Sequence, residues 1–244
     1  MPPLFQVSKR IQSCPDPVVA LTKRFMALRP DALSLGQGVV YWQPPPEALQ
    51  AAVSAVSLPA ASLYGPNEGL PELRAALREK VAHVNGLNEH EICVTHGAQQ
   101  AFINIAISLV DEDSEVIMFK PVYFDHMMTI AQLGGSAHIT WGEVDPATLR
   151  PSMPWLRRHL VPGSKGSRLL VLCNPCNPTG VMIPEAELQE ISDLCAAAGV
   201  WLVIDETYED FVWGKHEHHC VSGPHVLHIF SFSKAYGMMG WRAG

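Results

Sequence analysis

The chain has 244 residues, with 17 Lys and Arg against 24 Asp and Glu, so its formal net charge is −7. Its length suggests one large domain or two small ones. With 48% hydrophobic and 17% charged residues, the composition excludes a disordered chain and is typical of a globular protein. The acidic balance argues against nucleic acid or an anionic membrane surface as the main partner, because both are recognised by clustered Lys and Arg.

Targeting and redox signals point to the cytoplasm. No apolar run reaches the roughly 18 residues of a membrane span, and residues 1–10 lack the apolar core of a signal peptide. The six cysteines are too few and too scattered for a disulfide scaffold. We therefore expect a reduced, cytoplasmic protein with no membrane partner.

The predicted elements change character along the chain. Residues 1–45 are irregular and punctuated by proline, and helices are predicted over 47–56 and 71–84. Apolar strands then alternate with amphipathic helices, which predicts an α/β fold whose mostly parallel sheet is covered by helices on both faces. The expected strands are 91–95, 115–119, 137–141, 168–173, 200–205 and 225–231, and the expected helices are 98–109, 124–133, 153–160 and 185–198.

Polar and aromatic residues follow these strands where each one ends. In open α/β sheets, ligands bind outside the carboxyl ends of the strands. A glycine opening a helix there offers free backbone N–H groups to a phosphate, and a carboxylate ending an apolar strand needs a partner because its burial is costly. The residues at this edge are Gly97, Tyr123, Asn177, Asp205, Tyr208, Ser231, Lys234 and Arg242.

This combination of residues fits pyridoxal phosphate (PLP). PLP needs a lysine for a Schiff base and a carboxylate that keeps its pyridine nitrogen protonated, so that the ring acts as an electron sink. It also needs a phosphate pocket and an aromatic residue on the ring. Other cofactors fit less well, because residues 36–38 are not a dinucleotide fingerprint and the chain has no Gly-x4-Gly-Lys-Ser/Thr loop.

At these residues the sequence resembles the fold-type I, class I and II aminotransferases. The resemblance covers about residues 33–244, and its last block is highly specific. Within the family, three stretches resemble plant aromatic aminotransferases, which pass the amino group of methionine to aromatic 2-oxo acids such as phenylpyruvate or indole-3-pyruvate. The family blocks are residues 35–38, 64–74, 174–180, 205–208 and 231–242, and the narrower stretches are 37–45, 62–70 and 219–223.

The resemblance implies a role for each site residue. Lys234 would form the Schiff base with PLP and then act as general acid and base in the proton shift. Asp205 would pair with the pyridine nitrogen, while Tyr208 and Asn177 would hydrogen-bond the ring oxygen. Tyr123 would stack on the ring, and Gly38 would lie near the substrate carboxylate. Tyr64 would reach the phosphate bound by a neighbouring subunit. The residues expected to hold the phosphate are Gly97, Ala98, Gln99, Ser231 and Arg242. The substrates would be an amino acid and a 2-oxo acid, and the full-length form is expected to be a homodimer.

The resemblance also implies a domain organisation. Residues 46–244 would form the PLP-binding large domain, and residues 1–45 an arm at the active-site entrance. The family's small domain, with the arginine that clamps the substrate carboxylate, would lie beyond residue 244 and be largely missing. We therefore expect a C-terminally truncated chain that is inactive or strongly impaired by itself. Cys176 departs from the larger or polar residue common there in the family, which is expected to alter only loop packing.

Other functions remain open. A PLP-dependent carbon–sulfur lyase or an aminocyclopropane-carboxylate synthase-like enzyme would use the same lysine and aspartate. A third alternative is that the chain is a fragment without catalytic activity. Metal ligands are also present in Cys173, Cys176 and the segment 216–220, which contains His216, His218, His219 and Cys220. Strong zinc sites show paired motifs at matching spacing, and these residues do not, so we expect no structural metal.

Overall fold

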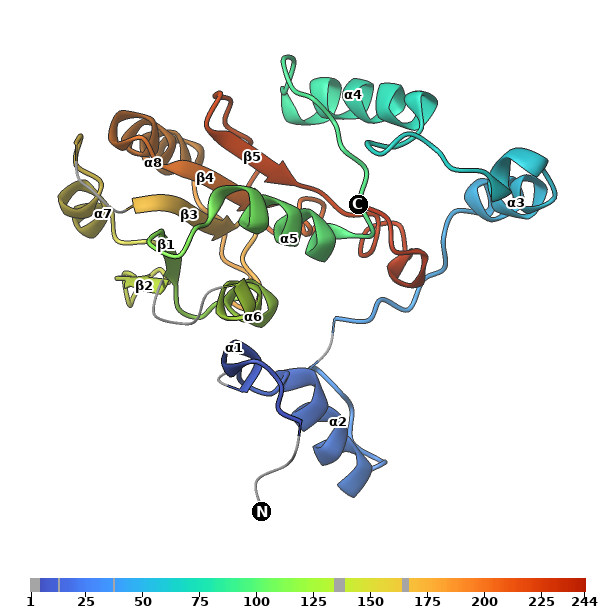
Figure 1. Ribbon diagram of the computed structural model, residues 1–244, viewed down its shortest axis with the longest axis horizontal. Helices are drawn as coiled ribbons and strands as arrows, with labels where there is room; N and C mark the ends of the chain where they lie inside the picture. The colour runs from blue at the N-terminus through green and yellow to red at the C-terminus, as the bar shows by residue number, and fades with distance from the viewer. Residues whose placement is uncertain (1–4, 13, 37, 134–138, 164–166) are drawn as a thin grey trace.

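The computed structural model describes residues 5–12, 14–36, 38–133, 139–163 and 167–244. In this part of the chain, five parallel strands form one sheet in the order β2-β1-β3-β4-β5 (Figure 1). The expected α/β architecture is therefore confirmed. The strands are β1 (Glu115–Phe119), β2 (Ile139–Gly142), β3 (Ser167–Cys173), β4 (Trp201–Asp205) and β5 (Val226–Ile229).

The helices begin and end where the local sequence favours it. Pro46 and Pro71 stand in the first turns of α3 and α4, where a missing backbone N–H costs nothing. Gly86 and Gly199 end α4 and α8 in the left-handed conformation, each with φ of 70°. The helices are α1 (Lys9–Gln12), α2 (Val18–Leu28), α3 (Pro46–Val56), η1 (Pro59–Ser62), α4 (Pro71–Asn85), α5 (Ala98–Leu109), α6 (Phe124–Leu133), α7 (Met153–His159), α8 (Glu185–Ala198) and η3 (Met239–Trp241).

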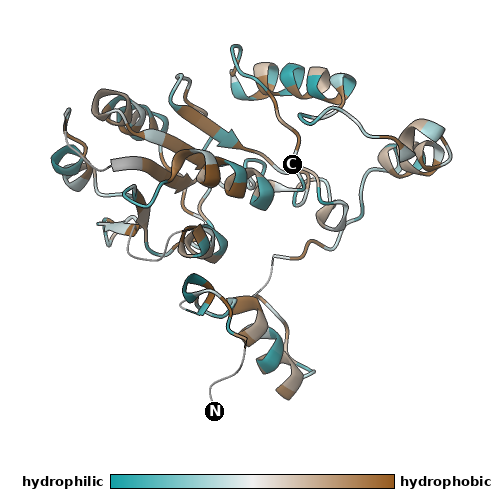
Figure 2. Cartoon of the chain, viewed as in Figure 1, coloured by the Kyte–Doolittle hydropathy of each residue, from teal (hydrophilic) through white to brown (hydrophobic). Residues whose placement is uncertain are grey.

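Two apolar clusters cover the two faces of the sheet. Alternate residues of β1 divide between them, with Ile117 in one cluster and Val116 and Met118 in the other. The first cluster packs against α7 and α8, and the second packs against α5 and α6. Figure 2 shows β3, β4 and β5 as largely hydrophobic. The buried residues of β1 are apolar, as are those of β4 before its last residue, and the buried carboxylate of Asp205 stands where β4 ends.

The structure corrects three expectations about elements. Residues 91–95 do not form a strand, because no described strand pairs along them; Val94 donates its N–H to the carbonyl of Glu68, and Thr95 exchanges backbone hydrogen bonds with Gly244. Residues 1–45, expected to be irregular, contain α1 and α2. The strand expected at 137–141 is Ile139–Gly142, while residues 134–138 lie outside the described residues.

The N-terminal helices lie outside the helix-covered sheet. Figure 1 shows α2 and α3 projecting away from it, and neither helix has a buried residue. α1 contacts α6, and Arg10 there donates a hydrogen bond to the carbonyl of Leu133 over 3.3 Å. Among the described residues, no helix is both long and apolar enough to span a membrane.

Candidate active site

The register of the sheet brings the ends of three strands into one row. Cys173 of β3 pairs with Asp205 of β4, and Asp205 pairs with Ile229 of β5. Because the strands are parallel, the segments that follow them leave the sheet at the same edge. Asn177, Tyr208 and Lys234 all lie in these segments.

Lys234 follows β5 and reaches across the edge toward the N-terminal segment. Its Nζ donates a hydrogen bond to the carbonyl oxygen of Gly38 and lies 5.9 Å from the centre of the Tyr208 ring. Burial, and then the positive charge of Arg242, lower the pKa of Lys234. A larger fraction of the amine is therefore unprotonated near neutral pH than in an exposed lysine.

Asp205 ends β4 as a buried carboxylate with two hydrogen-bond donors. Its side chain lies 3.1 Å from Nε2 of His126, and the backbone N–H of Thr207 donates to its Oδ1 over 3.0 Å. Burial by itself would raise the pKa of Asp205, but the hydrogen bonds from His126 and Thr207 more than offset this, so the pKa lies below its ordinary value. Asp205 is thus a fixed negative charge at the edge of the sheet.

Sequence reasoning missed His126. This residue is buried on the first turns of α6, with 3% of its surface exposed, and its ring contacts Phe102 and Tyr123. The available signal was its position three residues after Tyr123, which puts the two on one face of the helix start. Nothing in the sequence linked that face to Asp205.

Tyr208 and Asn177 meet beside Lys234. Nδ2 of Asn177 donates to the Tyr208 hydroxyl over 3.4 Å. Burial, with a further contribution from Cys173, raises the pKa of Tyr208 to about 12, so the phenol keeps its proton at neutral pH. A Cβ at Gly38 would lie 3.3 Å from Nζ of Lys234 and 3.4 Å from the Tyr208 hydroxyl, so the structure brings these predicted residues together.

Tyr123 lies just before α6 and is half-buried. Its hydroxyl donates to Oδ2 of Asp125 over 2.8 Å, and its ring meets the His126 ring edge-on at 5.2 Å. Burial and the charge of Asp125 raise its pKa. Tyr123 and Asn177 line a small cavity of about 50 Å³ together with His126.

The start of α5 forms an anion-binding feature with Arg242. Gly97 caps this helix with φ of 80°, and a Cβ there would lie only 2.6 Å from Nη2 of Arg242. Among the described residues, the backbone N–H groups of Ala98 and Gln99 have no hydrogen-bond acceptor, and Arg242 forms no ion pair with a carboxylate. Free N–H groups and an uncompensated guanidinium favour an anion.

Three other predicted residues have different surroundings. The side chain of Gln99 turns toward Thr129, to which its Nε2 donates over 2.9 Å, so only its backbone N–H faces the anion-binding feature. The hydroxyl of Ser231 accepts a hydrogen bond from the N–H of Ser233. Tyr64 is fully exposed, and the structure does not bring it to the other site residues. Its implied contact with a neighbouring subunit stays a prediction.

A much larger cavity, of about 1060 Å³, lies between α4 and β5. Ser231 is the one predicted site residue that lines it. Lys234 and Asp205, whose pKa values are both lowered, lie outside it. We therefore place the candidate active site at the carboxyl edge of the sheet and not in the larger cavity.

Comparison with known proteins agrees with the fold. The profile of the family described as aminotransferase class I and II matches residues 30–244. The chain therefore belongs to the class I and II aminotransferase family.

Individual relatives include enzymes of two named specificities. The chain is 43% identical to aromatic aminotransferase ISS1 of Arabidopsis thaliana over 238 residues, which cover 98% of this chain and 60% of that protein. It is 31% identical to the aspartate/prephenate aminotransferase of Thermus thermophilus, covering 98% of this chain and 63% of that protein. Among solved structures, aspartate aminotransferase from Thermus thermophilus with maleate superposes with a TM-score of 0.90 at 30% identity, covering 99% of this chain and 64% of that one. The chain thus spans about 60% of the length of the curated relatives it matches.

The lowered pKa of Lys234 predicts how its reactivity depends on pH. Arg242→Met removes a positive charge that disfavours the ammonium form, so the pKa of Lys234 should rise and its labelling should begin at higher pH than in the wild type. The measurement is labelling by 1-fluoro-2,4-dinitrobenzene, a neutral reagent for free amines, followed by peptide mass spectrometry across a pH series. The labelling profile of Lys9, read in the same digest, should not change. A Lys234 profile unaltered by the substitution would contradict the assigned role of Arg242.

Proposed function

We propose that this chain binds PLP at Lys234 and carries the cofactor-binding half of an aminotransferase site. The observation that carries the proposal is that the half-buried amine of Lys234 and the buried carboxylate of Asp205, both of lowered pKa, lie at the same edge of the sheet. Two further features fit PLP. The free N–H groups at the start of α5, together with Arg242, would bind the phosphate of PLP. Gly97 has no side chain, which allows Arg242 to approach this helix start closely.

When bound, PLP supplies a protonated pyridine ring that accepts the electron pair released at the α-carbon of an amino acid. Asp205 would hold the proton on the pyridine nitrogen, because its own pKa is kept low by His126 and Thr207. Tyr208 and Asn177 would hydrogen-bond the ring oxygen, and the aromatic ring of Tyr123 would cover the cofactor ring. Gly97, Ala98, Gln99, Ser231 and Arg242 would hold the phosphate.

Lys234 would move the proton of the reaction. An amine with a lowered pKa can take a proton from one carbon and return it to another, as general base and then general acid. In the structure its hydrogen bond to the carbonyl of Gly38 holds the amine at the edge where the cofactor would bind. Gly38 lies beside both Lys234 and Tyr208, so its position is consistent with a role near the substrate carboxylate.

The proposed substrates follow from the relatives. We propose methionine or an aromatic amino acid as donor and an aromatic 2-oxo acid as acceptor, supported by the 43% identity to an enzyme named as an aromatic aminotransferase. The aspartate/prephenate aminotransferase is less similar, at 31%. That this chain is impaired by itself, and that the active form is a homodimer, stay predictions.

The cofactor assignment predicts a covalent adduct. Borohydride treatment of the chain with PLP should fix a pyridoxyl group on the peptide that contains Lys234, and Lys234→Ala should lose the adduct. Lys9→Ala is the matched control, because Lys9 is an exposed residue of α1 outside the site, and its loss should leave the Lys234 adduct in place. An adduct that persists in Lys234→Ala would overturn the assignment.

The substrate class predicts a particular product. With PLP-loaded protein in amounts comparable to substrate, ¹⁵N-labelled methionine and phenylpyruvate should yield ¹⁵N-phenylalanine, because the amino group is transferred and not released. Isotope-resolved mass spectrometry of the products makes the measurement. Release of ammonia, a thiol or a cyclic product would instead indicate a lyase or a cyclising enzyme.

A further inference from the structure

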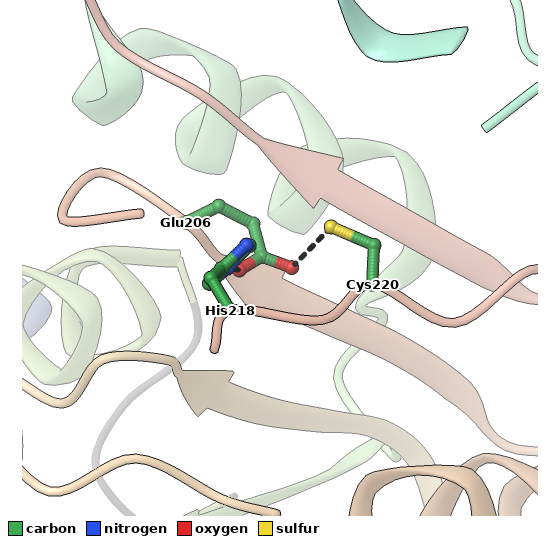
Figure 3. Close-up of side chains that lie close together, drawn as sticks. All are labelled: Glu206, His218 and Cys220. Atoms are coloured by element: carbon green, nitrogen blue, oxygen red, sulfur yellow. Dashed lines mark hydrogen bonds and ion pairs between the residues drawn. The ribbon is translucent and has the colours of Figure 1, made fainter. Parts of the chain in front are cut away.

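A second cluster of ionisable groups surrounds Glu206, the residue that follows Asp205 in the chain. This residue directly follows β4 and is completely buried. Its Oε2 lies 2.6 Å from Nε2 of His218, and the thiol of Cys220 points at its Oε1 over 3.6 Å. Figure 3 shows the three side chains converging, and their ligand atoms all lie within 4.8 Å of one another.

Burial of a carboxyl group is costly unless a proton or a cation neutralises its charge. Among the described residues, no lysine or arginine forms an ion pair with Glu206, and Lys80 is paired with Glu209 at 2.5 Å and also donates to Asn85. The remaining groups that face Glu206 are His218, His228 and the Cys220 thiol. Either protons within this cluster or a cation held among its side chains would neutralise the Glu206 carboxylate.

The histidines are arranged as metal-site histidines commonly are. His228 contacts Oε1 of Glu206 through Nδ1 at 3.0 Å, and its Nε2 lies 3.0 Å from the carbonyl of Val221. His218 also hydrogen-bonds the backbone of Asn174. A ligand histidine is commonly held in place by a hydrogen bond from its other ring nitrogen, as the backbone of Asn174 would hold His218. Both ring nitrogens of His228 face oxygen atoms, so His228 is a neighbour of the cluster that contacts Glu206.

We propose that Glu206, His218 and Cys220 form a zinc-binding site, with water in the fourth position and His228 orienting the Glu206 carboxylate. A carboxylate, an imidazole and a thiolate are the three ligand types that zinc accepts in tetrahedral sites. Neighbouring ligand atoms around such an ion lie about 3.3 to 3.7 Å apart, given bond lengths of roughly 2.0 to 2.3 Å. The 3.6 Å between sulfur and Oε1 already fits this spacing.

The distance between His218 and Glu206 must open by less than about 1 Å to admit the ion. His218 and Cys220 lie in the connection between β4 and β5, which forms no helix or strand over residues 211–225. In the part of the chain that the structure describes, the backbone of residues 218–220 takes part in no helix or sheet hydrogen bond, so a small displacement there breaks none. The ion would fasten this connection to the end of β4, directly beyond Asp205.

The site differs from the metal motif considered in the sequence. His218 and Cys220 belong to that motif, but Glu206 comes from another segment and supplies the buried charge. Neither Cys173 nor Cys176 takes part. The expectation of no structural metal, drawn from ligand spacing alone, could not include a ligand that only the fold brings near.

The test uses the full 244-residue chain, first treated with chelator and then supplied with zinc or cobalt(II). Elemental analysis after desalting should find about one zinc per chain, as a three-ligand protein site predicts. Cobalt(II) should give a near-ultraviolet thiolate-to-metal band, because Cys220 supplies sulfur. PLP binding at Lys234 is measured separately, so failure of either assignment can be distinguished from failure of the other.

Matched variants identify the ligands. Cys220→Ser should abolish the cobalt–thiolate band and His218→Gln should abolish stoichiometric zinc, while Cys93→Ser and His216→Gln, at exposed positions outside the cluster, should retain both. His228→Gln should weaken zinc affinity by roughly 10- to 100-fold, as loss of an orienting group does. Circular dichroism confirms that each variant is folded.

Two results would overturn the proposal. One is wild-type protein that loses zinc on desalting and gives no cobalt–thiolate band, which would mean that protons alone balance Glu206. The other is a thiolate band that survives in Cys220→Ser, which would place the metal on other cysteines. Because the wild-type measurement decides the first outcome, it does not depend on any variant folding.

Discussion

Cys173, Asp205 and Ile229 stand in one row across three parallel strands, and the candidate site depends on this register. Both faces of the sheet are packed with apolar side chains, so a polar group within a strand needs a partner of its own, as His228 of β5 has in Glu206. Polar groups are therefore concentrated where the strands end. Parallel pairing brings those ends to a single edge, even though the residues come from distant parts of the chain.

Electrostatics then set the protonation state of each group at that edge. Asp205 is buried, which disfavours its charge, but His126 and the Thr207 N–H stabilise the carboxylate more strongly. Lys234 is half-buried near Arg242, and both effects disfavour its ammonium form. The site thus pairs a carboxylate that stays ionised with an amine that gives up its proton readily. Acid and base roles are separated by environment, as in many catalytic sites.

Much of this arrangement could be predicted from sequence because it depends on local patterns. The apolar runs predicted the strands that form the sheet, and the residues after them predicted Asp205, Tyr208 and Lys234 as neighbours. The segment 91–95 shows the limit, since an apolar run becomes a strand only when another strand pairs with it. His126 and Glu206 show another limit. Each meets partners from distant segments, and no spacing in the sequence records those contacts.

The central claim is that the carboxyl edge of the sheet holds PLP through Lys234, Asp205 and the start of α5. A crystal structure of the chain with PLP tests it most directly. The account predicts the cofactor joined to Lys234, its pyridine nitrogen against Asp205, and its phosphate at the backbone N–H groups of Ala98 and Gln99 beside Arg242. PLP joined to another lysine, or seated in the large cavity between α4 and β5, would contradict it.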